Sequence, residues 1–174
     1  NGLTIIPVPA PHRLLSPFAH ILPALQAARR FRPHLITAQS PWESGPLALL
    51  AGRLCGAAVL LQLHGDIGTP EWNAQGFGFK LRSWITRHIC RIADGIRVVT
   101  NRMKQRLSES WNIPADRFFV VPVPVTLPAP CPLTPEEAKN ALQPGLGRHP
   151  TVLFVGRLYA PKNLALWVRT SALI

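Results

Sequence analysis

Short apolar runs alternate with longer amphipathic segments along most of this chain. The short runs are rich in β-branched residues and indicate strands at residues 3–8, 34–38, 57–63, 96–100 and 117–123. The segments between them repeat apolar residues at helical spacing and indicate helices at residues 20–31, 45–56, 78–94 and 101–110. Strands that alternate with helices are typical of a parallel sheet covered on both faces. The pattern therefore predicts an α/β, Rossmann-like doubly wound domain.

The pattern changes near residue 122. Residues 122–150 hold eight prolines and two glycines, too many for continuous regular structure beyond a short helix starting at Pro135. Residues 151–155 then indicate a new buried strand, followed by a helix. We therefore predict an N-terminal domain over 1–127, an interdomain linker over 128–149, and a truncated second domain over 150–174.

Composition narrows the class of protein. Nineteen Lys and Arg against eight Asp and Glu give a net charge of +11, which favours an anionic partner. The three cysteines are far apart without a C-x-x-C motif, so we expect neither a disulfide framework nor a zinc site, and a reducing cytoplasm. No apolar run approaches the roughly 20 residues of a membrane span. The opening at Asn1, without a basic leader, predicts no secretory signal and a start within a longer protein.

Ligands of open parallel sheets bind at the carboxyl ends of the strands. His64 and Asp66 follow the strand at 57–63, and the loop after 34–38 carries Ser40, Glu43 and Ser44. A histidine there can donate to a substrate hydroxyl or phosphate, or simply bond a neighbouring carbonyl. The sequence supplies no further ligands for a metal and no D-x-D motif.

The stretch "GRLYAPKN" follows the strand at 151–155. Gly156 lets the backbone turn sharply, Arg157 offers a planar fork of donors, and Lys162 adds a point charge at the start of a helix, where phosphates are attracted. These residues predict a clamp for a diphosphate. The alternative is that they are two surface cations of a basic protein.

The helix at 78–94 has two distinct faces in projection. One arc is apolar and is expected to face the core, with Leu81, Ile85, Ile89 and Ile92. Another arc combines cations with an aromatic residue, with Lys80, Trp84, Arg87 and Arg91. This second arc fits contact with an anionic membrane surface, and it equally fits a solvated basic face.

The motif "LFVGRLYAPKN" closely resembles the segment that opens the second domain of family 4 (group 1) glycosyltransferases of the GT-B fold. The stretches "QLHGD", "ADGIRVVTNRM" and "DRFFVVPVPV" precede this motif in the order that the family has. The resemblance therefore covers almost the whole chain, most strongly from Leu60 onward. The sequence departs from the family at "PVPV", where Pro-Asn-Gly is usual, and at Asn163, where a glycine is common.

The resemblance implies a first domain that receives a saccharide or lipid-linked acceptor and a second that binds a nucleotide-sugar donor. Arg157 and Lys162 would then hold the donor diphosphate, with His64 beside the transferred sugar. Reaction would be metal-independent and retaining, without a cofactor, in bacterial polysaccharide or glycolipid synthesis. The enzyme would be cytoplasmic, with peripheral contact at the inner face of the membrane, and this fragment would be inactive alone.

Two other functions remain open from the residues. A GT-B-like nucleotide-sugar epimerase would need catalytic carboxylates in the first domain, for which Asp66 and Glu71 are the candidates. A basic nucleic-acid-binding module is disfavoured, because the cations are spread along the chain and the aromatic residues do not alternate with them.

Overall fold

The computed structural model describes residues 4–9, 19–65, 67–127, 129–130, 132–148, 150–156 and 163–172. The chain divides into two units, Asn1–Pro124 and Val125–Ile174, and each is considered by itself. The predicted organisation into a domain, a linker and a second domain stays a prediction.

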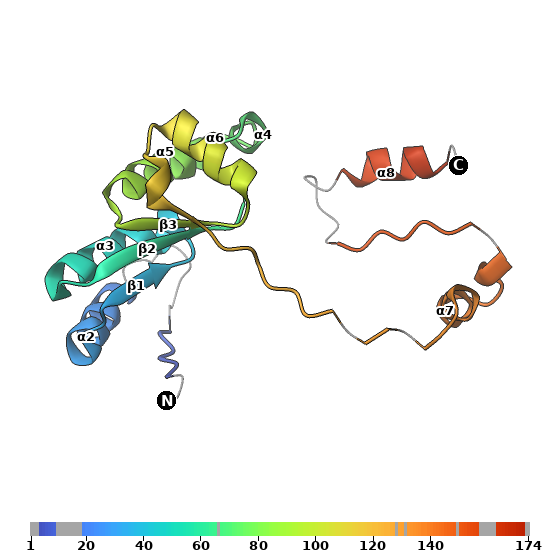
Figure 1. The fold of residues 1–174 in the computed structure, drawn as a ribbon, viewed down its shortest axis with the longest axis horizontal. Helices are drawn as coiled ribbons and strands as arrows, with labels where there is room; N and C mark the ends of the chain where they lie inside the picture. Colours follow the sequence, from blue (N-terminus) through green and yellow to red (C-terminus); the bar gives the residue numbers. More distant parts are fainter. Residues whose placement is uncertain are drawn as a thin grey trace. The chain divides into compact units, whose positions relative to one another are not determined.

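A parallel sheet organises the first unit. Its four strands are β1 (Leu35–Ala38), β2 (Ala58–Leu63), β3 (Gly95–Val98) and β4 (Phe118–Val120). They lie side by side in sequence order, and every neighbouring pair is parallel (Figure 1). Ala38 pairs with Leu61, and Leu63 pairs with Val98, so the strands end at a common edge. The predicted α/β class and Rossmann-like parallel sheet are confirmed.

The helices of this unit connect the strands. They are α2 (Ile21–Phe31), α3 (Pro41–Cys55), the short α4 (Pro70–Asn73), α5 (Phe77–Ile92) and α6 (Asn101–Trp111). Local chemistry sets several of their ends. Thr100 accepts a hydrogen bond from the Met103 amide at the start of α6 (3.1 Å). At the end of α3, Gly56 adopts a left-handed conformation (φ 68°), which a glycine takes without strain.

One hydrophobic core joins the sheet to α3, α5 and α6. The fully buried side chains include Leu61 and Leu63 of β2, Ile96 of β3, and Leu107 of α6. Neighbouring strands joined in sequence order by right-handed crossovers place every connecting helix on the same face. The core accordingly lies on that face, and a helical layer over the other face stays a prediction.

The opposite face of the sheet carries a polar network. Gln62 Nε2 donates to Thr37 Oγ1 (3.2 Å), and Arg97 Nη1 donates to Gln62 Oε1 (2.6 Å). Arg97 also donates to the Val121 carbonyl through Nε (3.2 Å) and Nη2 (3.1 Å), and through Nη2 to the Pro122 carbonyl (3.4 Å). One guanidinium thus fastens the backbone just after β4 to the centre of the sheet.

Two predicted strands are wrong among the described residues. Residues 4–9 and 151–155 have no regular structure, and Ile5 (76% exposed) and Val155 (84% exposed) lie largely in solvent. A strand gains its hydrogen bonds from a neighbour, so an apolar run without a partner strand does not form one.

The second unit has little buried structure. It contains α7 (Pro135–Leu142), a short 3-10 turn (Leu146–Arg148) and α8 (Leu164–Ser171), and none of its described residues is buried. The predicted helix at Pro135 is confirmed, with Thr134 and Glu137 forming a reciprocal capping box. Across the described part of the chain, no helix has both the length and the apolar character that a bilayer crossing requires.

Candidate functional site

The carboxyl edge of the sheet is where a ligand is expected. His64 directly follows β2 and is exposed, while Ser40 lies two residues beyond β1 and precedes α3. Because β1 and β2 are adjacent and in register at Ala38 and Leu61, these two loops leave the sheet side by side. This edge therefore brings the two sequence-predicted loops of the first unit together.

The loop after β1 is organised by the start of α3. The Ser40 carbonyl accepts hydrogen bonds from the amides of Glu43 (3.0 Å) and Ser44 (2.9 Å), and also from Ser44 Oγ (3.0 Å). The Ser44 hydroxyl donates its proton to its own helix. Glu43 is exposed in the first turn, and the Ser40 side chain makes no capping bond. Ser40 and Glu43 are thus better placed than Ser44 to meet a ligand, and the acceptor role of all three stays a prediction.

The loop after β2 is held against the core by a hydrogen bond and by buried residues. The Gly65 carbonyl accepts from the Ile67 amide (2.8 Å), and Ile67 is buried at 3% exposure. Gly68 has φ 82°, and a Cβ there would lie 3.2 Å from the Trp111 ring, so a side chain at this position would be both strained and crowded. The anchored loop leaves His64 on the surface. Asp66 lies outside the described residues.

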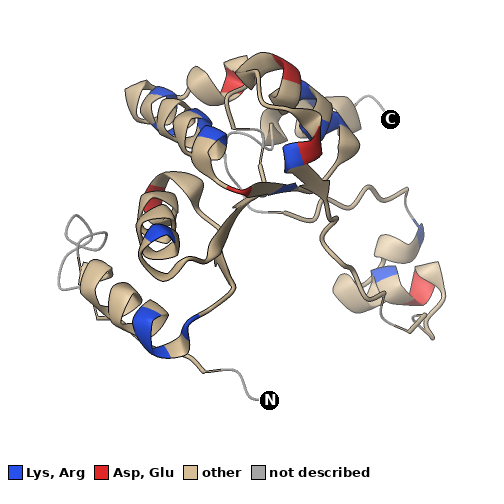
Figure 2. Cartoon of the chain, turned by 60° about the vertical axis from the view of Figure 1, so that its left-hand side comes forward, with Lys and Arg blue, Asp and Glu red and all other residues tan. Residues whose placement is uncertain are grey.

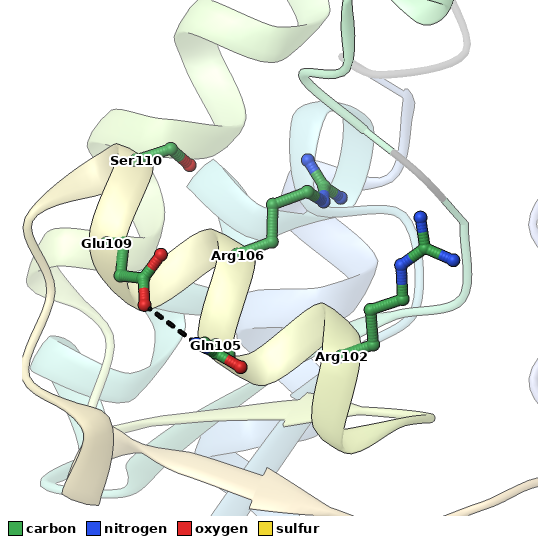
Figure 3. A pocket seen from close by; sticks show the side chains of 5 residues that line it. All are labelled: Arg102, Gln105, Arg106, Glu109 and Ser110. Atoms are coloured by element: carbon green, nitrogen blue, oxygen red, sulfur yellow. Dashed lines mark hydrogen bonds between the residues drawn. The ribbon is translucent and has the colours of Figure 1, made fainter.

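A basic groove on α6 adjoins this loop and was missed by the sequence analysis. It has a volume of about 600 Å³ and is lined by Arg102, Gln105, Arg106, Glu109 and Ser110 (Figure 3). Arg102 and Arg106 extend to the same side, and Arg106 Nη1 donates to the Ile67 carbonyl (3.2 Å). The sequence feature that could have indicated this groove is the spacing of four residues between the two arginines, which places them on one face of a helix.

The "GRLYAPKN" stretch is described only in part, because Arg157 and Lys162 lie outside the described residues. The backbone bends at Gly156, as predicted, with φ outside the left-handed region. A Cβ there would lie 3.1 Å from the Phe154 ring, so the glycine also leaves room for that ring.

Asn163 begins the helix that follows. It has a left-handed conformation (φ 47°, ψ 48°), and its side chain accepts from the Leu166 amide (3.4 Å) at the start of α8. Asparagine tolerates this conformation better than other residues with a side chain. The departure from glycine at this position therefore keeps the backbone geometry that a glycine would allow.

A cofactor or metal finds few candidate ligands in the structure. Within the described ranges, no group of three or more His, Cys, Asp or Glu side chains is arranged to hold a metal ion. The groups available at the sheet edge are a histidine, hydroxyls, a carboxylate and the two arginines of the α6 groove. They can donate hydrogen bonds to hydroxyls and balance the charge of an anion.

Comparison with known proteins gives two findings. The family model described as "Glycosyl transferase 4-like domain" matches residues 1–124. The alpha-maltose-1-phosphate synthase of Mycolicibacterium smegmatis (strain ATCC 700084 / mc(2)155) is 30% identical over 130 residues, covering 71% of this chain and 33% of that protein. The chain therefore spans about a third of the length of this curated relative.

Proposed function

Since the chain belongs to the glycosyl transferase 4-like family, we propose that it forms part of an enzyme that transfers a sugar from a nucleoside-diphosphate sugar to a saccharide or lipid-linked acceptor. The family match over the first unit carries this proposal. It covers the sheet whose carboxyl edge presents His64, Ser40 and Glu43. We assign the binding of the acceptor to this unit.

The donor side rests on the "GRLYAPKN" stretch. In the reaction, the bond between the anomeric carbon and a diphosphate oxygen breaks, a new bond to an acceptor oxygen forms, and the proton of the acceptor hydroxyl passes to the departing diphosphate. Negative charge grows on the departing nucleoside diphosphate. Arg157 and Lys162 stabilise that charge electrostatically, and the transfer is metal-independent, with retention at the anomeric carbon. No cofactor takes part.

The acceptor side involves His64 and the adjoining loops. His64 lies beside the transferred sugar, and Ser40, Glu43, Ser44 and Asp66 form the acceptor loops. The synthase relative makes, by its name, a phosphorylated disaccharide. If the acceptor of this chain also carries a phosphate, the basic groove of Arg102 and Arg106 offers a place for that anionic group. The enzyme works in the cytoplasm, in bacterial polysaccharide or glycolipid synthesis, with peripheral contact at the inner face of the membrane.

Diphosphate binding tests the donor assignment. Charge-assisted hydrogen bonds to a phosphate contribute about 1.5–3 kcal/mol each. Arg157→Ala or Lys162→Ala in the intact protein should therefore weaken nucleoside-diphosphate binding by about one to two powers of ten, with little effect on nucleoside alone. Arg157→Lys should also lose affinity, because a point charge does not reproduce the planar fork. Isothermal titration with diphosphate and with nucleoside measures these changes.

Arg148→Ala is the matched control for these variants. Arg148 is an exposed cation of the same unit that the donor assignment does not use. Its removal should leave diphosphate affinity within about twofold. Equal losses for Arg148→Ala and Arg157→Ala would show that the affinity is diffuse electrostatics and would overturn the donor assignment.

His64→Ala tests the acceptor side in the intact enzyme. A group beside the reacting sugar acts chiefly in the transition state, so kcat should fall more than the donor KM rises. General acid–base or hydrogen-bonding groups contribute about 10²-fold or more to rate. Because His64 is exposed, its replacement should leave the melting temperature nearly unchanged. Turnover at the wild-type rate would show that His64 has no part in the reaction.

A further inference from the structure

The outward side of α5 carries an exposed apolar stripe. Phe77 (79% exposed), Leu81 (44%), Trp84 (60%) and Ile92 (53%) follow one another at spacings of four, three and eight residues. These spacings place them along one line of a helix. Leu81 and Ile92 were predicted to face the core, and that prediction is wrong.

The inward side of α5 shows why the stripe faces away from the core. The buried residues of the helix are Thr86, Ile89 and Cys90. At 100° per residue, their directions lie opposite or well to the side of Trp84. The helix therefore buries Ile89 together with the smaller Thr86 and Cys90, and it leaves the side of Phe77 and Trp84 in solvent.

Trp84 and His88 form a surface pair within the stripe. Their ring centroids are 4.3 Å apart, and His88 Nδ1 lies 2.8 Å from the Trp84 carbonyl oxygen. A carbonyl only accepts, so Nδ1 carries the hydrogen of this bond. The pair gives the stripe an amphipathic centre of the kind that favours a membrane–water interface.

Cations flank the stripe along one side. Lys80, Arg87 and Arg91 project next to it, and α5 contains no Asp or Glu between residues 77 and 92. Figure 2 shows this unequal distribution of charge over the chain, with blue residues outnumbering red ones. Arg82 is different, because its guanidinium lies over the rings of Trp42 (5.8 Å) and Phe79 (5.3 Å).

The flanking cations differ in how far they are engaged. Arg91 donates to the Trp111 carbonyl through Nε (3.3 Å) and Nη2 (2.9 Å), which ties it to α6. Lys80 is exposed, whereas Arg87 is half-buried and its Nε is buried without a hydrogen-bond partner among the described residues. Lys80 is thus the cation most available to an anionic partner, and Arg87 reaches the surface only with part of its side chain.

We propose that the stripe of Phe77, Leu81, Trp84 and Ile92, with Lys80, Arg87 and Arg91, is a docking face for an anionic lipid bilayer. The apolar side chains enter the boundary between headgroups and acyl chains, and the cations meet lipid phosphates. A helix of 16 residues lying flat covers about 24 Å of such a surface. The docking face is the surface that would make the peripheral membrane contact of the proposed function. Vesicle binding can be measured without sugar transfer, so the two proposals can fail separately.

Charge argues for a bilayer over a second copy of this chain. Pairing two α5 faces about a two-fold axis would bring cations against cations, with no acid on either helix to balance them. An anionic bilayer supplies both the negative charge and the apolar layer that the exposed side chains match. Self-association through α5 is accordingly an outcome that would overturn the proposal.

Vesicle sedimentation of the full chain tests the docking face. We compare vesicles of phosphatidylcholine alone with vesicles that contain about one third phosphatidylglycerol. Binding should favour the anionic vesicles and weaken at high salt. A basic residue near an anionic surface contributes about fivefold to partitioning, so Lys80→Gln with Arg87→Gln should lower the partition coefficient about thirtyfold. Phe77→Ser with Trp84→Ser should lower it at least tenfold.

Two matched control pairs separate the face from general properties of the chain. Arg29→Gln with Arg30→Gln removes the same amount of charge from exposed positions on α2. Phe31→Ser with Leu54→Ser removes two apolar side chains that lie outside α5 and are each 53% exposed. Both pairs should keep wild-type partitioning within about twofold. Circular dichroism confirms that each variant is folded before it is compared.

Three outcomes would overturn the docking face. An equal loss for the α2 arginine pair would assign the binding to net charge, and unchanged binding of the Phe77 and Trp84 variant would show that the stripe stays out of the bilayer. Dimerisation that disappears in the Phe77 and Trp84 variant, seen by analytical ultracentrifugation without vesicles, would assign the stripe to a protein contact.

Discussion

Two free cysteines of the first unit lie in contrasting environments. Cys90 is fully buried beneath the sheet, and burial raises the pKa of its thiol to about 12 from the usual 9.0. Cys55 is half-buried at the end of α3, with Sγ 2.5 Å from the Ala51 carbonyl oxygen. Because the thiolate is the reactive form, the two side chains should react at very different rates.

Alkylation of the folded protein at pH 8 tests this difference. Iodoacetamide should modify Cys55 at least a hundredfold faster than Cys90, and unfolding in guanidinium should make their rates similar. Peptide mapping by mass spectrometry distinguishes the sites. Equal labelling in the folded state would show that Cys90 is accessible and would contradict the buried core position.

The same residue predicts a pH dependence of stability. The folded pKa of Cys90 lies above the unfolded value, so its protonated form stabilises the fold fully below pH 9. That contribution to the free energy of unfolding is lost as the pH rises from about 9 to about 12. Cys90→Ala should flatten this alkaline loss in urea titrations, at the expense of lower stability near neutral pH.

Single residues of the candidate site were partly predictable. His64 could be placed because an apolar run ended directly before it, and a strand end fixes the position of the next residue. Gly156 could not, since its requirement for a small residue comes from the Phe154 ring two positions earlier. The partner of Arg106 is the Ile67 carbonyl, 39 residues away in sequence, and a contact of that range leaves no mark in a local pattern.

At the scale of elements, the contact between α3 and β2 depends on a glycine. A Cβ at Gly52 would lie 2.5 Å from Val59 Cγ2 and 2.9 Å from the Ala57 carbonyl oxygen. Gly52→Ala should therefore lower the free energy of unfolding by roughly 1–3 kcal/mol, despite the better helix propensity of alanine. Gly78→Ala in α5 meets nothing within 4 Å and should raise stability by about 0.5–1 kcal/mol.

Chemical denaturation of both glycine variants measures the difference. The midpoints should shift in opposite directions, with similar m-values. The Gly78 variant is the matched control, because it adds the same methyl group to a helix with open space around it. Equal stabilisation by both substitutions would show that α3 does not approach β2 this closely.

Periodicity predicted the elements better than their orientation. The helical spacing from residue 78 to 94 gave α5, but Leu81 and Ile92 lie outside because Thr86 and Cys90 occupy the contact with the core together with Ile89. Small residues pack where a helix comes close to its neighbours, and hydrophobicity alone does not show this. The strand at 151–155 failed for a related reason, since strand formation depends on a partner that no local pattern reveals.

At the scale of the whole molecule, the two units differ in how much they bury. In the first unit, Leu61 and Ile96 are at 0% exposure, and α3, α5 and α6 cover the sheet. In the second unit, no described residue is buried, and α7 and α8 have eight residues each. The alternating pattern predicted the first unit because each strand and helix finds its partner nearby in sequence. Helices as short as α7 and α8 are marginal without packing.

Hydrogen exchange followed by mass spectrometry tests this contrast. Amides of β2 and β3 should exchange only through cooperative unfolding, at least about 10³-fold more slowly than an unstructured peptide. Amides of residues 151–156 and of α7 should exchange within about tenfold of the unstructured rate, because exposed backbone bonds open locally. The chain in concentrated urea provides the unprotected reference. Protection of residues 151–156 equal to that of β2 would mean that this apolar run is a paired strand after all, and that the second unit has a core of its own.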